Sequence, residues 1–214
     1  MKEKQVLKQL TDRKDRKYSQ YASWALYQVS DQQLQISDDK EKVRKKDVTI
    51  EPFRDKLEES INLNGIFLGL NCSRQISSDI NETATEWSNF HDTSQYSQDY
   101  KIPYMIKGTK YEGSYMTDLF KNYPMVDSNQ FEENIVKPEN RSIYNTSVEL
   151  FQEEYNIIKP KTIICFGDKV EKFLTDMIKN EELTVDSNVE IIKIKHYSAQ
   201  LSYECLKKES DKLR

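Results

Sequence analysis

The stretch Gly65-Ile66-Phe67-Leu68-Gly69-Leu70-Asn71 is a short apolar run that ends on a polar residue. It predicts a buried strand that carries a functional group at its carboxyl end. Two later runs, over residues 162–167 and 189–196, repeat the pattern and end at Gly167 and His196. Because the carboxyl ends of parallel strands meet at one edge of a sheet, we expect Asn71, Gly167 and His196 to converge there.

Helical patterns separate these runs. A helix is expected from Glu51 onward, because Phe53, Leu57 and Ile61 recur every four residues and Pro52 suits a first turn. Strands that alternate with helices require right-handed crossovers and a sheet covered on both faces. The sequence therefore predicts a three-layer α/β/α fold with a central, mainly parallel four-stranded sheet. The remaining expected elements are a strand over 113–119 and helices over 142–155, after residue 167 and over 201–213.

The chain is long enough for one substantial domain. We expect residues 1–50 to form an N-terminal extension packed on the main domain, and residues 51–214 to form the α/β domain itself. Trp24, in the most aromatic part of the extension, is expected to anchor it in the core. Residues 72–112 form a long polar crossover, which is typical of a binding loop.

Composition limits the class of protein. The net charge of −4 does not indicate nucleic-acid binding, but lysines cluster over 2–17, 40–46 and 193–208. They form either a local basic face or ordinary solvated helix faces. Three widely spaced cysteines support neither a disulfide framework nor a four-thiolate cluster, and no apolar run is long enough to span a membrane. We expect a cytoplasmic protein without metal or cofactor, whose oligomeric state the sequence does not indicate.

Polar residues at the strand ends are the candidates for chemistry. His196 follows the last expected strand, where a neutral imidazole can donate a hydrogen bond to a developing anion. The amide of Asn71 can position water or serve as a turn residue. Asp118 can accept hydrogen bonds from an exocyclic amine or a ring N–H, or cap a helix. Ser198 can hydrogen-bond a leaving group or a phosphate, or act as a cap.

Weaker candidates lie in the crossover and beside it. Phe90 offers a stacking face for a planar ligand, or is an ordinary core residue. His91 is equally suited to a functional and a structural role. Tyr115 is a candidate for contact with a ring and Arg74 for attraction of a phosphate. Ser73, like Ser198, is a conceivable nucleophile, but the chain lacks a Gly-x-Ser-x-Gly elbow.

The order of these motifs resembles the uracil-DNA glycosylase superfamily over roughly residues 60–206. The resemblance implies an enzyme that flips a base out of DNA and hydrolyses its N-glycosidic bond without a metal. It makes Asn71 the water-positioning residue, Phe90 the stacking ring, Asp118 the base-recognising side chain and His196 the stabiliser of the departing base. The motifs that carry it are Gly69-Leu70-Asn71, Phe90, Asp118, Phe166-Gly167 and His196-Tyr197-Ser198.

The chain also departs from the family pattern. Cys72 and Tyr197 stand where the family usually has proline, and Asp118 stands where a uracil reader commonly presents an amide. As an acceptor, Asp118 prefers an amino-bearing edge. The leading hypothesis is therefore a DNA-glycosylase-like hydrolase for a damaged, modified or mismatched base. The alternative is a noncatalytic member that binds DNA, a nucleotide or a protein partner through the same crevice.

Overall fold

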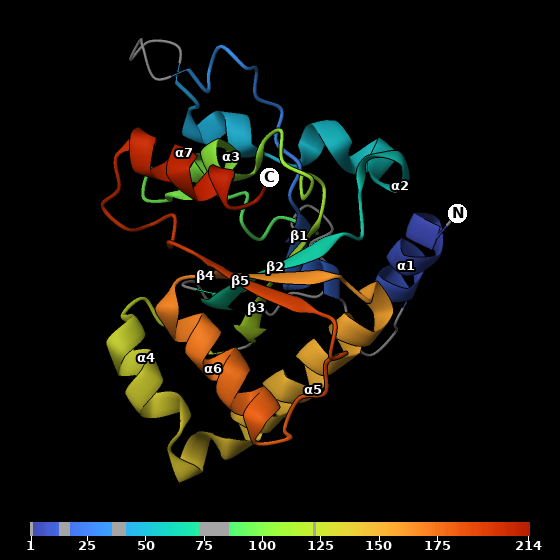
Figure 1. Ribbon diagram of the computed structural model, residues 1–214, viewed down its shortest axis with the longest axis vertical. Helices are drawn as coiled ribbons and strands as arrows, with labels where there is room; N and C mark the ends of the chain where they lie inside the picture. The colour runs from blue at the N-terminus through green and yellow to red at the C-terminus, as the bar shows by residue number, and fades with distance from the viewer. Residues whose placement is uncertain (1, 13–17, 36–41, 73–85, 122) are drawn as a thin grey trace.

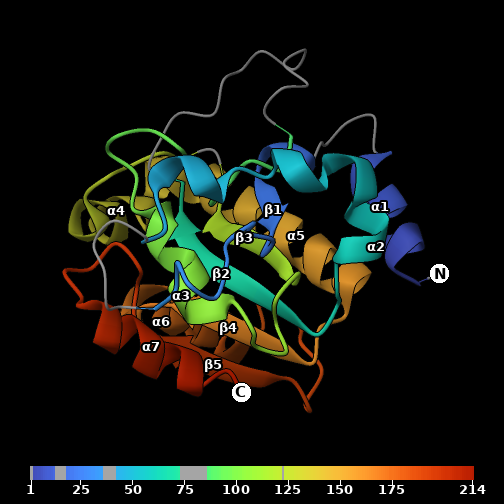
Figure 2. The ribbon, with the colours of Figure 1, turned by 90° about the horizontal axis from the view of Figure 1, so that it is seen from above.

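A five-stranded sheet with the order β1-β3-β2-β4-β5 lies at the centre of the chain. The computed structural model describes residues 2–12, 18–35, 42–72, 86–121 and 123–214 (Figure 1). Figure 2 shows the five strands side by side in this order. Their bounds are β1 Ala22–Trp24, β2 Gly65–Asn71, β3 Tyr115–Phe120, β4 Thr162–Phe166 and β5 Glu190–Ile194.

Four of these strands, β2 to β5, are mutually parallel. The predicted α/β class and mainly parallel sheet are therefore confirmed. The predicted number of four strands is wrong, because β1 pairs antiparallel with β3, with Ala22 opposite Thr117 and Trp24 opposite Tyr115. β1 has only three residues, all buried, which is too short a run to give a recognisable strand pattern in the sequence. Part of the expected N-terminal extension thus forms an edge strand of the sheet.

Helices cover both faces of the sheet. In Figure 1, α3 and α7 lie above it, and α4, α5 and α6 lie below it. Among the residues that the structure describes, no helix has the length and apolar character needed to cross a membrane. The α-helices are α1 Lys2–Thr11, α2 Leu57–Ser60, α3 Ile102–Ile106, α4 Ser128–Ile135, α5 Arg141–Ile158, α6 Asp168–Lys179 and α7 Tyr203–Asp211. Short 3-10 helices span Tyr18–Gln20, Lys45–Val48, Glu51–Lys56, Asp99–Lys101 and Pro138–Asn140.

Helix α5 follows directly from its apolar spacing. Its buried side chains include Tyr144, Val148, Phe151 and Tyr155, which recur every three or four residues. The helix ends where Lys159 adopts a left-handed conformation with a φ of 49°. By contrast, the helix expected from Glu51 is only partly α-helical, since its first six residues form a 3-10 helix and α2 adds a single turn.

Side chains of each strand alternate between two cores. From β2, Ile66 and Leu68 pack into the core between the sheet and helices α5 and α6, whereas Phe67 packs into the core on the α3 and α7 side. Gly69 follows Phe67 by two residues and so lies on the same face of the strand. This face carries the candidate site.

A buried ion pair joins α5 to the end of β3. Lys121 Nζ lies 2.7 Å from Glu154 Oε2, and both side chains are almost completely buried. The ammonium also donates to the carbonyl of Asp118 (2.7 Å). Glu154 Oε1 accepts hydrogen bonds from the hydroxyls of Tyr115 (2.8 Å) and Thr117 (3.0 Å). Loss of one charge would leave the other buried and unpaired.

We expect Lys121→Met to lower the free energy of unfolding by about 3–5 kcal/mol, because it leaves the Glu154 carboxylate unpaired. The double variant Lys121→Met, Glu154→Gln should recover most of this loss, since Gln keeps an acceptor for Tyr115 and Thr117. Urea unfolding measures both. A single variant as stable as the wild type would show that the pair does not hold β3 against α5.

Candidate active site

A cleft of about 1420 Å³ opens at the carboxyl edge of the sheet. Strand β2 has β3 on one side and β4 on the other, so the chain reverses its direction of winding at this strand. Such a switch point is where open α/β sheets bind ligands. The cleft is bordered by Asn71 from β2, Asp118 from β3, Gly167 after β4 and His196 after β5. The predicted convergence of these strand ends is therefore confirmed.

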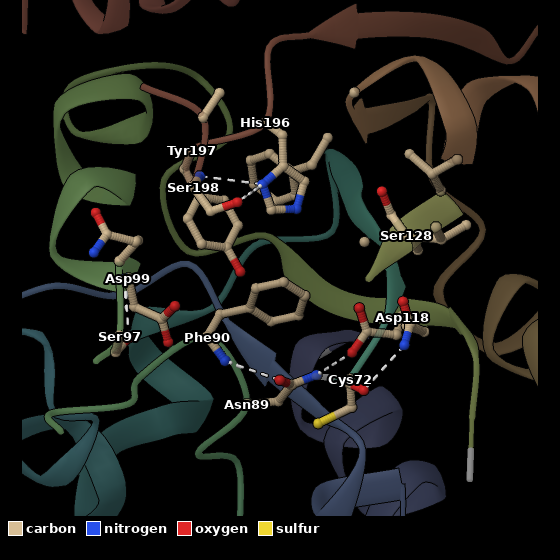
Figure 3. Close-up of a pocket in the computed structure, with 18 of the residues that line it drawn as sticks. Cys72, Asn89, Phe90, Ser97, Asp99, Asp118, Ser128, His196, Tyr197 and Ser198 are labelled. Carbon is tan, nitrogen blue, oxygen red and sulfur yellow. Dashed lines mark hydrogen bonds between the residues drawn. The ribbon is translucent and has the colours of Figure 1, made fainter. Parts of the chain in front are cut away.

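Gly69 allows two side chains to meet over the central strand. It is paired in register with Asp118 on β3. A Cβ added at Gly69 would overlap Asp118 Oδ1 and would lie 3.1 Å from Cζ of Phe90. Glycine within a strand often marks a close approach of this kind. The carboxylate and the aromatic ring therefore share one wall of the cleft, as Figure 3 shows.

Asp118 is a buried carboxyl, 5% exposed, that Asn89 holds in place. Asn89 Nδ2 donates to Asp118 Oδ2 (2.9 Å) and to the carbonyl of Tyr21 (2.8 Å). Burial raises the pKa of Asp118 to about 6, although the hydrogen bond from Asn89 and the charge of Lys121 oppose the rise. Carboxyls whose pKa is raised by desolvation are frequent at functional sites.

His196 faces the cleft from the segment that follows β5. The backbone N–H of Ser198 donates to His196 Nδ1 (3.1 Å), and the Ser198 hydroxyl lies 2.8 Å from the same nitrogen. Because a backbone N–H can only donate, Nδ1 is the acceptor and the proton of the neutral ring is on Nε2. Burial lowers the pKa of His196 to about 4, which keeps the ring neutral at physiological pH. Figure 3 shows Nε2 directed into the cleft.

The Asn71 side chain has a structural role, because its amide nitrogen bonds to backbone carbonyls. Its Nδ2 donates to the carbonyls of Cys72 (3.1 Å), Tyr123 (3.3 Å) and Met125 (2.9 Å). These contacts tie the end of β2 to the segment that leads into α4. Among the described residues no group donates to Asn71 Oδ1, so this oxygen is the atom that can accept from water or ligand.

Phe90 is held in a strained backbone conformation. Its φ is 64°, in the left-handed region that non-glycine residues adopt at a cost. The ring is 5% exposed and packs near Phe166 (6.0 Å between centroids) and Tyr197 (6.3 Å). Phe90 thus belongs both to the core and to the wall of the cleft.

Other candidates lie elsewhere or serve the fold. Both ring nitrogens of His91 face carbonyl oxygens, those of Val48 and Trp24, and burial lowers its pKa to about 4. Tyr115 points to the opposite face of the sheet, where it contacts Glu154. Ser198 orients His196, as described above. Ser73 and Arg74 lie outside the described residues.

Sequence reasoning missed three contributors to the site. Asn89 gives no signal in the sequence, because its role depends on a contact across 29 residues. Tyr197 lies against His196, with 4.5 Å between ring centroids. Its pKa is raised well above the usual value, mainly by burial and next by Asp99. Gly69 was within reach of prediction, because an isolated glycine inside a strand pattern indicates a close approach.

Lysines around the cleft are largely neutralised. Lys193 pairs with Asp168 (2.7 Å) and Glu171 (2.9 Å). Lys169 lies 3.4 Å from a carboxylate oxygen of Glu132. Of the two readings of the basic clusters, these contacts favour solvated, paired side chains at this rim.

Within the described part of the chain, no group of three or more His, Cys, Asp or Glu residues is placed to hold a metal ion. No protein-family model matches the chain, and no curated protein matches its sequence.

We expect Asp118→Asn to stabilise the protein at neutral pH. A carboxyl whose pKa rises from 3.8 to about 6 on folding loses stability as pH increases from below 3.8 through 6, to a total of ~3 kcal/mol. Asn cannot ionise but keeps an acceptor for Asn89. Urea unfolding should therefore show the variant more stable than the wild type by ~2–3 kcal/mol at pH 7.5.

This advantage should shrink toward pH 4, where Asp118 is largely protonated in the folded state. The exposed Asp168 is the control, and Asp168→Asn should show no such gain at pH 7.5. An Asp118→Asn variant that is less stable than the wild type at pH 7.5 would contradict the assignment of a destabilising buried charge.

Proposed function

We propose that the protein is a DNA-glycosylase-like hydrolase, which breaks the N-glycosidic bond of a nucleobase held in this cleft. The observation that carries the proposal is the neutral His196, whose Nε2–H faces the same cleft as Asn71 and Asp118. The resemblance of the motifs to the uracil-DNA glycosylase superfamily supports it, since the residues named from that resemblance border one cleft.

The proposed reaction needs two groups. As the bond between C1′ and the base nitrogen breaks, its electron pair moves to the base, and the Nε2–H of His196 stabilises the resulting anion. Water positioned by Asn71 Oδ1 attacks C1′ and becomes its hydroxyl group, which keeps one proton, while the other proton passes to the base anion or to solvent. A neutral imidazole serves here because it donates a hydrogen bond without having to give up a proton.

The base itself must reach the cleft from outside the duplex. The base can enter if it is flipped out of a duplex or if the substrate is single-stranded. The ring of Phe90 then offers a surface on which the planar base can stack. The volume of the cleft exceeds that of one base, so it also has room for the attached sugar and phosphate.

Binding without hydrolysis is the second candidate. The neutralised lysines at the rim favour it, since Lys193 and Lys169 both have acidic partners. A protein of this kind would bind DNA, a nucleotide or a protein partner through the cleft and release no base. DNA binding that weakens with salt, without any abasic product, would select this candidate.

We expect His196→Ala to lower the rate of base release about 10²–10³-fold, because it removes one preorganised donor. The assay uses single- and double-stranded oligonucleotides that contain uracil, hypoxanthine, mismatched cytosine or adenine, or other altered bases, with abasic sites detected by alkaline cleavage. Ser198→Ala is the matched control, since it removes the hydroxyl but keeps the N–H that fixes the tautomer. Its loss should be less than about tenfold.

Two results would contradict the proposal. One is no base release by the wild-type protein at high concentration on any of these substrates. The other is base release that survives His196→Ala unchanged, with circular dichroism showing that the variant is folded.

A further inference from the structure

We infer that the cleft selects nucleobases that carry an exocyclic amine beside a ring nitrogen acceptor, the edge that cytosine and adenine share, and that Asp118 Oδ1 receives the amine. The inference rests on the proposed function only in taking a nucleobase as the ligand. It concerns which base binds, whether or not the bond is then cleaved.

The carboxylate of Asp118 is fixed before any ligand arrives. Asn89 Nδ2 holds Oδ2, and Asn89 is itself fixed, since its Oδ1 accepts from the backbone N–H of Phe90 (3.1 Å). Both polar atoms of the Asn89 amide are therefore engaged. Asn89 therefore orients the Asp118 carboxylate, and the oxygen that can contact the base is Oδ1.

That oxygen, Oδ1, lies over the bare backbone of Gly69. No residue among those described donates a hydrogen bond to it. Figure 3 shows it directed toward the space between Phe90 and His196. A ligand that covers this oxygen removes it from solvent, so binding is favoured only when the ligand supplies an N–H in exchange.

An amine placed against Asp118 Oδ1 donates a hydrogen bond to it. A carbonyl in the same place sets its lone pairs against those of the carboxylate. Uracil and hypoxanthine have a ring N–H beside that carbonyl, but this N–H lies one ring position away from the amine that it would have to replace.

The acceptor depends on the charge of Asp118. Because burial raises the pKa of this carboxyl to about 6, the group is mainly ionised at pH 7.5 and mainly protonated at pH 5.5. His196, with its pKa lowered to about 4, stays neutral over that range. The charged or titratable groups that face Asp118 are Lys121 at the end of β3, Asp99 before α3, Glu154 on α5 and Tyr197 after β5.

Binding of matched oligonucleotides tests the inference. Each probe is a single-stranded run of thymidines with one 2′-fluoroarabino nucleotide, whose fluorine suppresses hydrolysis of the glycosidic bond. The bases form two pairs that differ at one edge, cytosine against uracil and adenine against hypoxanthine. At pH 7.5 we expect the amine-bearing member of each pair to bind at least tenfold more tightly, as measured by fluorescence anisotropy.

Two further measurements isolate Asp118. Between pH 7.5 and 5.5 the affinity for the amine-bearing probes should fall about fourfold in the wild type, because the ionised fraction falls by that factor. Asp118→Asn presents an amide in place of the carboxylate. It should abolish or reverse the preference and remove the pH dependence, and thermal unfolding at pH 7.5 confirms that it is folded.

The outcomes separate this inference from the proposed function. Equal affinities within each pair, a preference for the carbonyl member, or no binding of any probe would overturn the amine selectivity. An amine preference in a protein that releases no base would support the selectivity and overturn the hydrolase. Base release without an amine preference would support the hydrolase and overturn the selectivity.

Discussion

The close approach at Gly69 is the constraint on which the site depends. Because this position on β2 has no side chain, the carboxylate of Asp118 and the ring of Phe90 lie against the central strand. The carboxylate is buried there, which raises its pKa, and Asn89 fixes its direction. A side chain at position 69 would displace the Asp118 carboxylate or the Phe90 ring from the wall of the cleft.

Two costs in free energy accompany this arrangement. The buried Asp118 is ionised at neutral pH against its environment, and Phe90 is held with a positive φ. Neither feature stabilises the fold. Groups that cost free energy of folding are expected at functional sites, because contacts with a ligand can offset that cost. The opposite face of β3 shows the contrast, since there the buried charges of Lys121 and Glu154 are paired.

The positions of the strands were easier to predict from the sequence than the side-chain contacts of the site. Apolar runs located β2 and β4, because buried parallel strands lack polar interruptions. The run over 189–196 located β5, although only its Ile194 is buried, and the strand ends placed Asn71 and His196 at one edge. The three-residue β1 carries too little pattern to be recognised. The site was harder to predict, because the tautomer of His196 depends on Ser198 and the direction of Asp118 depends on Asn89. Such contacts arise from folding and leave no periodic signal in the chain.

We propose that Asp118 and His196 face one bound base from two sides. A crystal structure of the protein with a thymidine oligonucleotide that contains one 2′-fluoroarabino-cytidine would show whether they do. We expect the cytosine inside the cleft beside Phe90, with its amine on Asp118 Oδ1 and His196 Nε2 within hydrogen-bond distance of the ring. A base bound elsewhere, or in the cleft without contact to either residue, would contradict it.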